Sequence, residues 1–223
     1  MLESGDKAVA VRIADRFPTR FLKSYVYWKI RTDPIYRVVS EAFAGAVNLP
    51  LLDLGCGTGV LAFYLREHGF KGSIHGVDLD GPKIEVAKAI AAASDCRAVF
   101  DCVDFRDVRD SSHGHVTMLD VLLFVSEGTQ RELLARAASF VDESKGVLIV
   151  RTGIGDGSWR FKLTHVMDDI ACFFRWMKVR PVKYPSREIF REVLEPLGFE
   201  VEFRPLWGRM PFNNHVVIAR RKR

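Results

Sequence analysis

Three glycines at every second position, Gly55, Gly57 and Gly59, follow a short apolar run from Leu49 to Leu54. The apolar run has the length of a buried strand, and the residues after the last glycine begin a helical pattern. Glycines let the backbone turn sharply and approach a ligand where a Cβ atom would collide with it. A strand, a glycine turn and a helix in this order predict the first unit of a nucleotide-binding α/β sheet.

The spacing of the glycines separates two kinds of nucleotide site. A dinucleotide-binding turn has the form G-x-G-x-x-G, and its third glycine would fall where this chain has Val60. The observed G-x-G-x-G, with Asp53 two residues ahead of it, resembles the first motif of the class I S-adenosylmethionine-dependent methyltransferases. The resemblance implies that the loop packs against the methionine part of the cofactor and that Asp53 helps to hold its amino group. The loop residues concerned are Gly55, Cys56, Gly57 and Gly59.

A second acid ends the predicted strand at residues 73–78. Asp78 lies 19 residues after Gly59 and is followed by Leu79. A carboxylate at this point accepts strong hydrogen bonds from two ribose hydroxyls, or else caps the next helix. The methyltransferase resemblance favours the ribose, with Asp78 and Leu79 both in the cofactor site.

A third acid, Asp104, follows the predicted strand at residues 97–102 and precedes Phe105. The resemblance implies that Asp104 binds the adenine amino group and that Phe105 contributes backbone contact or packing to the ring. The alternative is an ordinary loop aspartate beside a core phenylalanine.

The predicted strand at residues 115–121 carries Asp120 near its carboxyl end, where ligands of open α/β sheets bind. Asp120 is a candidate for the cofactor site or the substrate side, or is simply a strand-end residue. Enzymes that methylate amines of bases often have Pro-Pro-Tyr here, whereas this chain continues with Val121 and Leu122. This continuation resembles methyltransferases that act on small molecules and lipid precursors.

Apolar strand patterns alternate with helical ones along the chain, which predicts a mainly parallel sheet. The predicted fold class is α/β: a Rossmann-like seven-stranded mixed sheet with helices on both faces and a C-terminal antiparallel hairpin. The strands are expected near 50–54, 73–78, 97–102, 115–121, 146–151, 199–205 and 214–219, and the helices near 34–46, 59–68, 82–92, 129–142, 159–178 and 186–196. Gly69 and Gly198 are expected stop signals of two helices.

Residues 1–48 are predicted to form an N-terminal helical cap or lid. Residues 49–223 are predicted to form the methyltransferase domain, with a cap insertion over the active site at about 153–185. Residues 15–40 mix aromatic with basic side chains. This mixture is compatible with a lid, with ordinary packing, or with transient contact with a membrane surface.

Candidate acceptor-binding residues lie outside the predicted sheet or at its strand ends. They are Tyr25, Arg151, Arg175, Tyr184, Asn213 and Asn214. The two arginines suit an acidic acceptor group, and the two asparagines alternatively serve a turn. His165 is the candidate general base, needed only for a hydroxyl or carbon-acid acceptor, although a cap histidine often only packs. His113 and His115 form H-x-H without a further ligand at metal spacing, so no metal is expected.

Composition narrows the class of protein further. The sequence has no run of about 18 apolar residues, so we expect no transmembrane helix. The N-terminus lacks the pattern of a signal peptide. Four cysteines without metal spacing favour a reducing compartment, and we expect a cytoplasmic protein. The net charge is +5, and the last four residues alone contribute four positive charges. The nearly neutral remainder argues against a broad nucleic-acid-binding face.

These features predict a methyltransferase that uses S-adenosylmethionine and releases S-adenosylhomocysteine. The expected acceptor is a small-molecule or lipid-like compound, methylated at oxygen or carbon. A protein or RNA methyltransferase is one alternative, and a non-catalytic S-adenosylmethionine-binding module is another. Retention of Asp53, Asp78 and Asp104 argues against the non-catalytic module.

Overall fold

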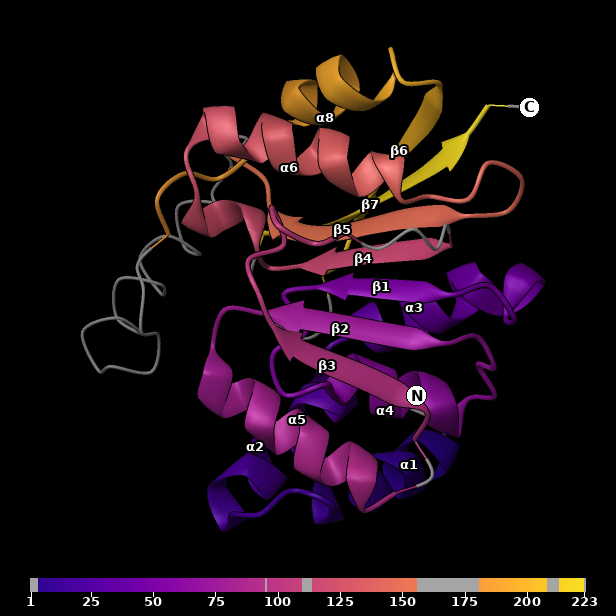
Figure 1. The fold of residues 1–223 in the computed structure, drawn as a ribbon, viewed down its shortest axis with the longest axis vertical. Coiled ribbons are helices and arrows are strands. Elements are labelled where there is room, and N and C mark those ends of the chain that lie inside the picture. The colour runs from indigo at the N-terminus through magenta and orange to yellow at the C-terminus, as the bar shows by residue number, and fades with distance from the viewer. Residues whose placement is uncertain (1–3, 95, 110–113, 156–180, 208–212, 223) are drawn as a thin grey trace. The chain divides into compact units, whose positions relative to one another are not determined.

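The computed structural model describes residues 4–94, 96–109, 114–155, 181–207 and 213–222. Figure 1 shows their arrangement. The chain divides into two compact units, Met1–His115 and Val116–Arg223, which are described in turn as unit 1 and unit 2.

Unit 1 begins with three helices and continues with parallel strands that alternate with helices. Its elements are α1 (Ser4–Asp15), α2 (Arg20–Thr32), α3 (Ile35–Phe43), η1 (Ala44–Ala46), β1 (Leu51–Leu54), α4 (Val60–Glu67), β2 (Ile74–Asp78), α5 (Gly81–Ala92) and β3 (Ala98–Cys102). β2 pairs in parallel with both β1 and β3. All four residues of β1 are buried, as in a parallel strand that is covered on both faces.

Phe100 explains why two positions near the glycine loop have no side chain. A Cβ atom at Gly76, its partner on β2, would lie 2.7 Å from the Phe100 ring, and a Cβ atom at Gly59 would lie 2.8 Å from it. Both distances are shorter than real contacts, so the buried ring fits only against two glycines. This packing sets the start of α4 closely against β2 and β3.

Unit 2 contains most of β4 and the antiparallel part of the sheet. The remaining elements are β4 (His115–Leu119), η2 (Leu122–Phe124), α6 (Glu127–Ser139), β5 (Val147–Gly153), α8 (Arg187–Leu194), β6 (Phe199–Pro205) and β7 (Asn214–Arg221). β4 pairs in parallel with β5, whereas β7 pairs antiparallel with both β5 and β6. The seven strands follow the order β3-β2-β1-β4-β5-β7-β6. The predicted seven-stranded mixed sheet with its C-terminal antiparallel hairpin is confirmed.

Gly69 and Gly198 follow α4 and α8 with φ of 82° and 86°. Gly69 directly follows the C-cap of α4, as predicted for a helix stop, whereas Gly198 lies four residues after the end of α8 and directly before β6. The expected helix at 159–178 lies outside the described residues. None of the described helices is long and apolar enough to cross a bilayer.

Candidate functional site

The glycine loop joins β1 to α4 and takes a conformation that side chains disfavour. Gly55, Gly57 and Gly59 have φ of 79°, 56° and 75°. The N–H groups of Gly55 and Cys56 both donate to the carbonyl oxygen of Val77, at 2.8 and 3.0 Å. These bonds fix the loop to the end of the neighbouring strand. Gly59 is the N-cap of α4 and has no side chain that could accept the N–H groups of the first helical turn. These N–H groups are therefore available to a ligand.

Asp78 is held by two backbone groups. Its Oδ2 accepts the Gly57 N–H at 2.8 Å, and its Oδ1 accepts the Asp80 N–H at 2.8 Å. Each carboxylate oxygen still has capacity for a further donor. The interpretation of Asp78 as a helix cap is wrong, since the side chain of Asp80 caps α5 by accepting the Lys83 N–H.

The apolar side chain of Leu79 is exposed next to Asp78. Its exposed fraction is 67%, which is high for a leucine and leaves an apolar surface beside the carboxylate. The pair therefore offers hydrogen-bond acceptors and a contact surface for a flat ring at the end of β2.

Asp53 near the end of β1 is buried, and Cys56 of the loop is half-buried. Asp53 is 2% exposed. Burial, followed by the negative charges of Asp53 and Asp78, raises the pKa of the Cys56 thiol strongly. A Cβ atom at Gly76 would lie 2.9 Å from the Cys56 Sγ atom, so the thiol fills the space over that glycine. Cys56 thus acts as a small packing group and not as a nucleophile.

Asp104 lies two residues after β3 and pairs with Arg106. The Arg106 Nε donates to both carboxylate oxygens, at 3.1 and 3.0 Å, and Nη2 donates to Oδ2 at 2.5 Å. These bonds from Arg106 hold the pKa of Asp104 below its usual range. The neighbouring Phe105 is half-buried.

In unit 2, Asp120 and Arg151 form an ion pair at the ends of β4 and β5. The Arg151 Nη1 donates to the Asp120 Oδ2, and the Asp120 N–H donates to the Arg151 carbonyl at 2.9 Å. Asp120 has φ of 60°, a rare conformation for any residue except glycine, asparagine and aspartate. The guanidinium expected to meet an acidic acceptor is thus already engaged by Asp120.

Three more of the predicted acceptor residues gather around the end of β5. The ring of Tyr184 packs on Gly153, where a Cβ atom would lie 2.9 Å from it. The Asn213 Nδ2 donates to the Ile154 carbonyl at 2.8 Å, and Asn214 begins β7 opposite Gly153. Strand register and side-chain bonds therefore bring together residues that lie about 30 to 60 positions apart.

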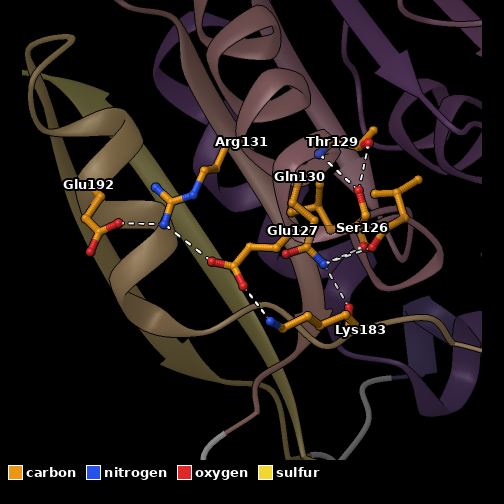
Figure 2. A network of polar contacts seen from close by, with 9 residues as sticks. Ser126, Glu127, Thr129, Gln130, Arg131, Lys183 and Glu192 are labelled. Carbon is orange, nitrogen blue, oxygen red and sulfur yellow. Dashed lines mark hydrogen bonds and ion pairs between the residues drawn. The ribbon is translucent and has the colours of Figure 1, made fainter.

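A polar network on α6, missed by the sequence analysis, supports this region (Figure 2). Buried Gln130 donates through Nε2 to the carbonyls of Leu122 and Lys183, at 2.9 and 2.8 Å. In Figure 2, the Glu127 side chain points toward Arg131 and Lys183, and Arg131 also contacts Glu192 of α8. The sequence feature that could have indicated this network is a glutamine at a position of α6 that faces the core.

The other predicted residues divide into two groups. Tyr25 lies on α2 and accepts a hydrogen bond from Lys29 at 3.2 Å, whereas His165 and Arg175 lie outside the described residues. The Nε2 of His115, at the beginning of β4, bonds the Ala46 carbonyl at 3.1 Å. The described part of the chain contains no cluster of side chains suited to a metal ion.

Comparisons with known proteins agree with this geometry. A family model described as a methyltransferase domain matches residues 51–144. The uncharacterized protein MJ0284 of Methanocaldococcus jannaschii is 38% identical over 198 residues, which cover 78% of this chain and 84% of the relative. The chain belongs to the class I S-adenosylmethionine-dependent methyltransferases.

Solved methyltransferases share the fold. Magnesium protoporphyrin IX methyltransferase from Synechocystis, solved with S-adenosylhomocysteine, aligns with a TM-score of 0.69 at 19% identity over 98% of this chain and 95% of its own. Human N-acetylserotonin methyltransferase in complex with S-adenosylmethionine aligns with a TM-score of 0.62 at 19% identity, over 84% of this chain and 52% of its own.

Both solved enzymes hold S-adenosylmethionine or S-adenosylhomocysteine, and the glycine loop of this chain has room for such a ligand. Among the described residues, the only atom within 4 Å of a Cβ added at Gly57 would be the Lys83 Cδ, at 3.9 Å. The loop therefore leaves space there that a side chain would fill. The charged acceptors of Asp78 and the exposed Leu79 suit a nucleoside.

Proposed function

We propose that the protein methylates an oxygen or carbon atom of a small-molecule or lipid-like acceptor. The observation that carries this proposal is the segment after Asp120, where an apolar 3₁₀ turn buries Leu122 and Leu123 in place of a Pro-Pro-Tyr motif. Two similar structures support the acceptor class, since their names give magnesium protoporphyrin IX and N-acetylserotonin as the compounds with which those enzymes work.

Unit 1 is proposed to hold the cofactor. Asp78 accepts the ribose hydroxyls, with Leu79 beside the nucleoside, and Asp104 accepts the adenine amino group next to Phe105. Asp53 holds the amino group of the methionine part, directly or through water. The glycine loop packs against that part through Gly55, Cys56, Gly57 and Gly59. Bound S-adenosylmethionine supplies an activated methyl group, so the protein mainly positions the acceptor and excludes water.

Acceptor binding is proposed for the end of β5 in unit 2. Tyr184, Asn213 and Asn214 gather there, and Arg151 with Asp120 adds a charged pair. The sequence adds Arg175 as an acceptor residue, whereas Tyr25 lies on the exposed face of α2 and is assigned to another contact below. His165 is proposed as the general base for a hydroxyl or carbon-acid acceptor.

The proposed place of action is the cytoplasm. Cys56, Cys96 and Cys102 are free thiols, and a reducing compartment keeps thiols in that state. Contact with a membrane surface is a separate proposal, which rests on α2 and is argued below.

Two measurements, made one after the other, test the proposed function. Calorimetry with S-adenosylhomocysteine, and with NAD as the control, should show binding of the first compound alone. The purified protein is then supplied with S-adenosylmethionine and a panel of phenols, carboxylic acids, carbon acids and isoprenoid alcohols, and S-adenosylhomocysteine release is followed. Turnover with a panel compound supports the proposal. Methylation of protein or RNA alone contradicts it, and cofactor binding with no methylation of any of these favours a non-catalytic module.

A further inference from the structure

The outer face of α2 exposes three aromatic side chains in one stripe. Phe21, Tyr25 and Trp28 are 77%, 48% and 59% exposed. They lie four and three residues apart, which places them on one side of a helix. Val26 and Ile30, on the opposite side of α2, are buried. The helix therefore has a packed apolar face and a second, aromatic face directed at solvent.

Basic residues flank this aromatic stripe. At 100° per residue, Arg20 and Arg31 lie along one edge of the stripe and Lys29 along the other. The Lys29 Nζ lies 5.5 Å from the centre of the Tyr25 ring. Neither arginine forms an ion pair with any described residue. The sequence from 16 to 32 has five basic residues and no acidic one, so the stripe lies in a positive surrounding.

The helix is also fastened to the body of unit 1, as a docking element requires. α2 packs chiefly on α1, and Lys23 of α2 lies 3.7 Å from Asp15 of α1. Arg12 of α1 lies 2.8 Å from Glu67 at the end of α4, and Arg16 contacts the same carboxylate. In Figure 1 both helices, drawn in indigo, lie beyond α4 and α5 of this unit.

We propose that α2 binds the surface of an anionic lipid bilayer. The aromatic stripe lies at the level of the headgroups, where tyrosine and tryptophan rings are favoured, and the basic edges face lipid phosphates. Each basic residue near such a surface strengthens binding about fivefold. The contact is peripheral, and it does not depend on which acceptor the enzyme methylates.

Charge favours a lipid surface over a second copy of the chain. A symmetric dimer through this face would place the basic edges of two α2 helices against each other, and like charges repel. An anionic bilayer complements both edges and also accepts the apolar centre of the stripe.

The test is flotation of the full-length protein with vesicles of phosphatidylcholine alone and of phosphatidylcholine with 30% phosphatidylglycerol. The protein should float with the anionic vesicles, and raised salt should weaken the binding. Phe21→Ser with Trp28→Ser should lower the partition coefficient at least tenfold, and Arg20→Gln with Arg31→Gln about 25-fold. The matched controls are Trp207→Ser for an exposed aromatic ring and Lys88→Gln with Lys145→Gln for two surface charges. They should bind like the unchanged protein.

Circular dichroism of each variant checks the fold, because Phe21, Trp28 and Arg20 are exposed whereas Arg31 is half-buried, with its Nη1 atom enclosed. Equal binding to both vesicle types, or no binding to either, overturns the proposal. Dimerisation that the aromatic variant abolishes would also overturn it, because the aromatic face would then bind a second copy of the chain. Binding of single-stranded RNA in preference to anionic vesicles would overturn it as well. S-adenosylhomocysteine affinity, measured separately, reports on the methyltransferase site and is expected to be the same in all variants.

Discussion

The glycine loop of unit 1 and the end of β5 in unit 2 are stabilised in different ways. The loop is held by backbone N–H groups that donate to Val77 and Asp78. The end of β5 has backbone bonds as well, from the Asp120 N–H to Arg151 and from the Gly155 N–H to Pro185, but it adds side-chain contacts to them. These are the Asp120–Arg151 ion pair and the amides of Asn213 and Gln130. The first region is a backbone structure supported by one carboxylate, whereas the second adds a network of side chains to its backbone bonds.

Because of this difference, we expect the two regions to respond differently to substitutions. A backbone loop with positive φ tolerates little change at its glycines, and a change there acts on the ligand that it cradles. A side-chain network is altered residue by residue, and its members act on each other and on local stability. We therefore expect substitutions in unit 1 to change cofactor affinity and substitutions in unit 2 to change stability or turnover.

The largest expected effect is that of Gly57→Val. A β-branched side chain at φ of 56° is strained by about 1–2 kcal/mol and fills the space assigned to the cofactor. S-adenosylhomocysteine binding should weaken at least 100-fold, or about 2.7 kcal/mol, by calorimetry. Gly69→Val is the matched control, since Gly69 also has positive φ and open space around it but follows α4. Equal loss of affinity in both variants would show that strain, and not the cradle, causes the effect.

Asp78→Ala should have the next largest effect. The variant loses a charged acceptor for the ribose and the support of the Gly57 N–H, so cofactor binding should weaken by about 1.5–3 kcal/mol. Asp101→Ala removes the same charge from the neighbouring strand, where the carboxylate lies 3.0 Å from His75. Calorimetry should find the affinity of this control unchanged. Unchanged affinity in Asp78→Ala would contradict the ribose assignment.

The sequence alone predicted most of unit 1, because its features are local. The loop glycines, Asp78 and Asp104 each follow a strand that apolar residues define, and parallel strands bring their carboxyl ends to one edge. The contact of Phe100 with Gly59 and Gly76 was not predicted, since it depends on how β3 lies against β2.

Unit 2 was predicted in outline but not in its contacts. The hairpin follows from two apolar runs without a helix between them, whereas the pairing of Arg151 with Asp120 joins residues 31 positions apart. Spacing along the chain does not reveal which charged groups meet across parallel strands. The role of Gln130 likewise depends on Leu122 and Lys183, which reach it from different segments.

Arg151→Ala tests the side-chain network. The variant leaves the Asp120 carboxylate without its ion-pair partner at a site where the arginine side chain is 13% exposed and the aspartate side chain 35%. The free energy of unfolding should fall by about 1–2 kcal/mol, measured by urea denaturation. When Arg151→Ala is introduced into Asp120→Asn, the loss in the free energy of unfolding should be smaller, because the carboxylate charge at position 120 is already absent. S-adenosylhomocysteine affinity should stay within twofold, and a tenfold loss would contradict the division between the two regions.

The smallest effect is expected at the exposed part of the network in Figure 2. Lys183, followed by Arg131, lowers the pKa of Glu127 below its ordinary value. A carboxylate with a lowered pKa stabilises the fold above its ordinary pKa, and this contribution is lost as the pH falls through the lowered value. Lys183→Ala should therefore raise the pKa of Glu127 toward 4.5, and more than Arg131→Ala does, in a carboxyl-detected NMR titration. Lys88→Ala, which removes the partner of Glu85 on α5, is the control and should leave Glu127 unchanged. A larger rise of the Glu127 pKa in Arg131→Ala than in Lys183→Ala would contradict this order, because Arg131 on α6 would then be the main partner of Glu127.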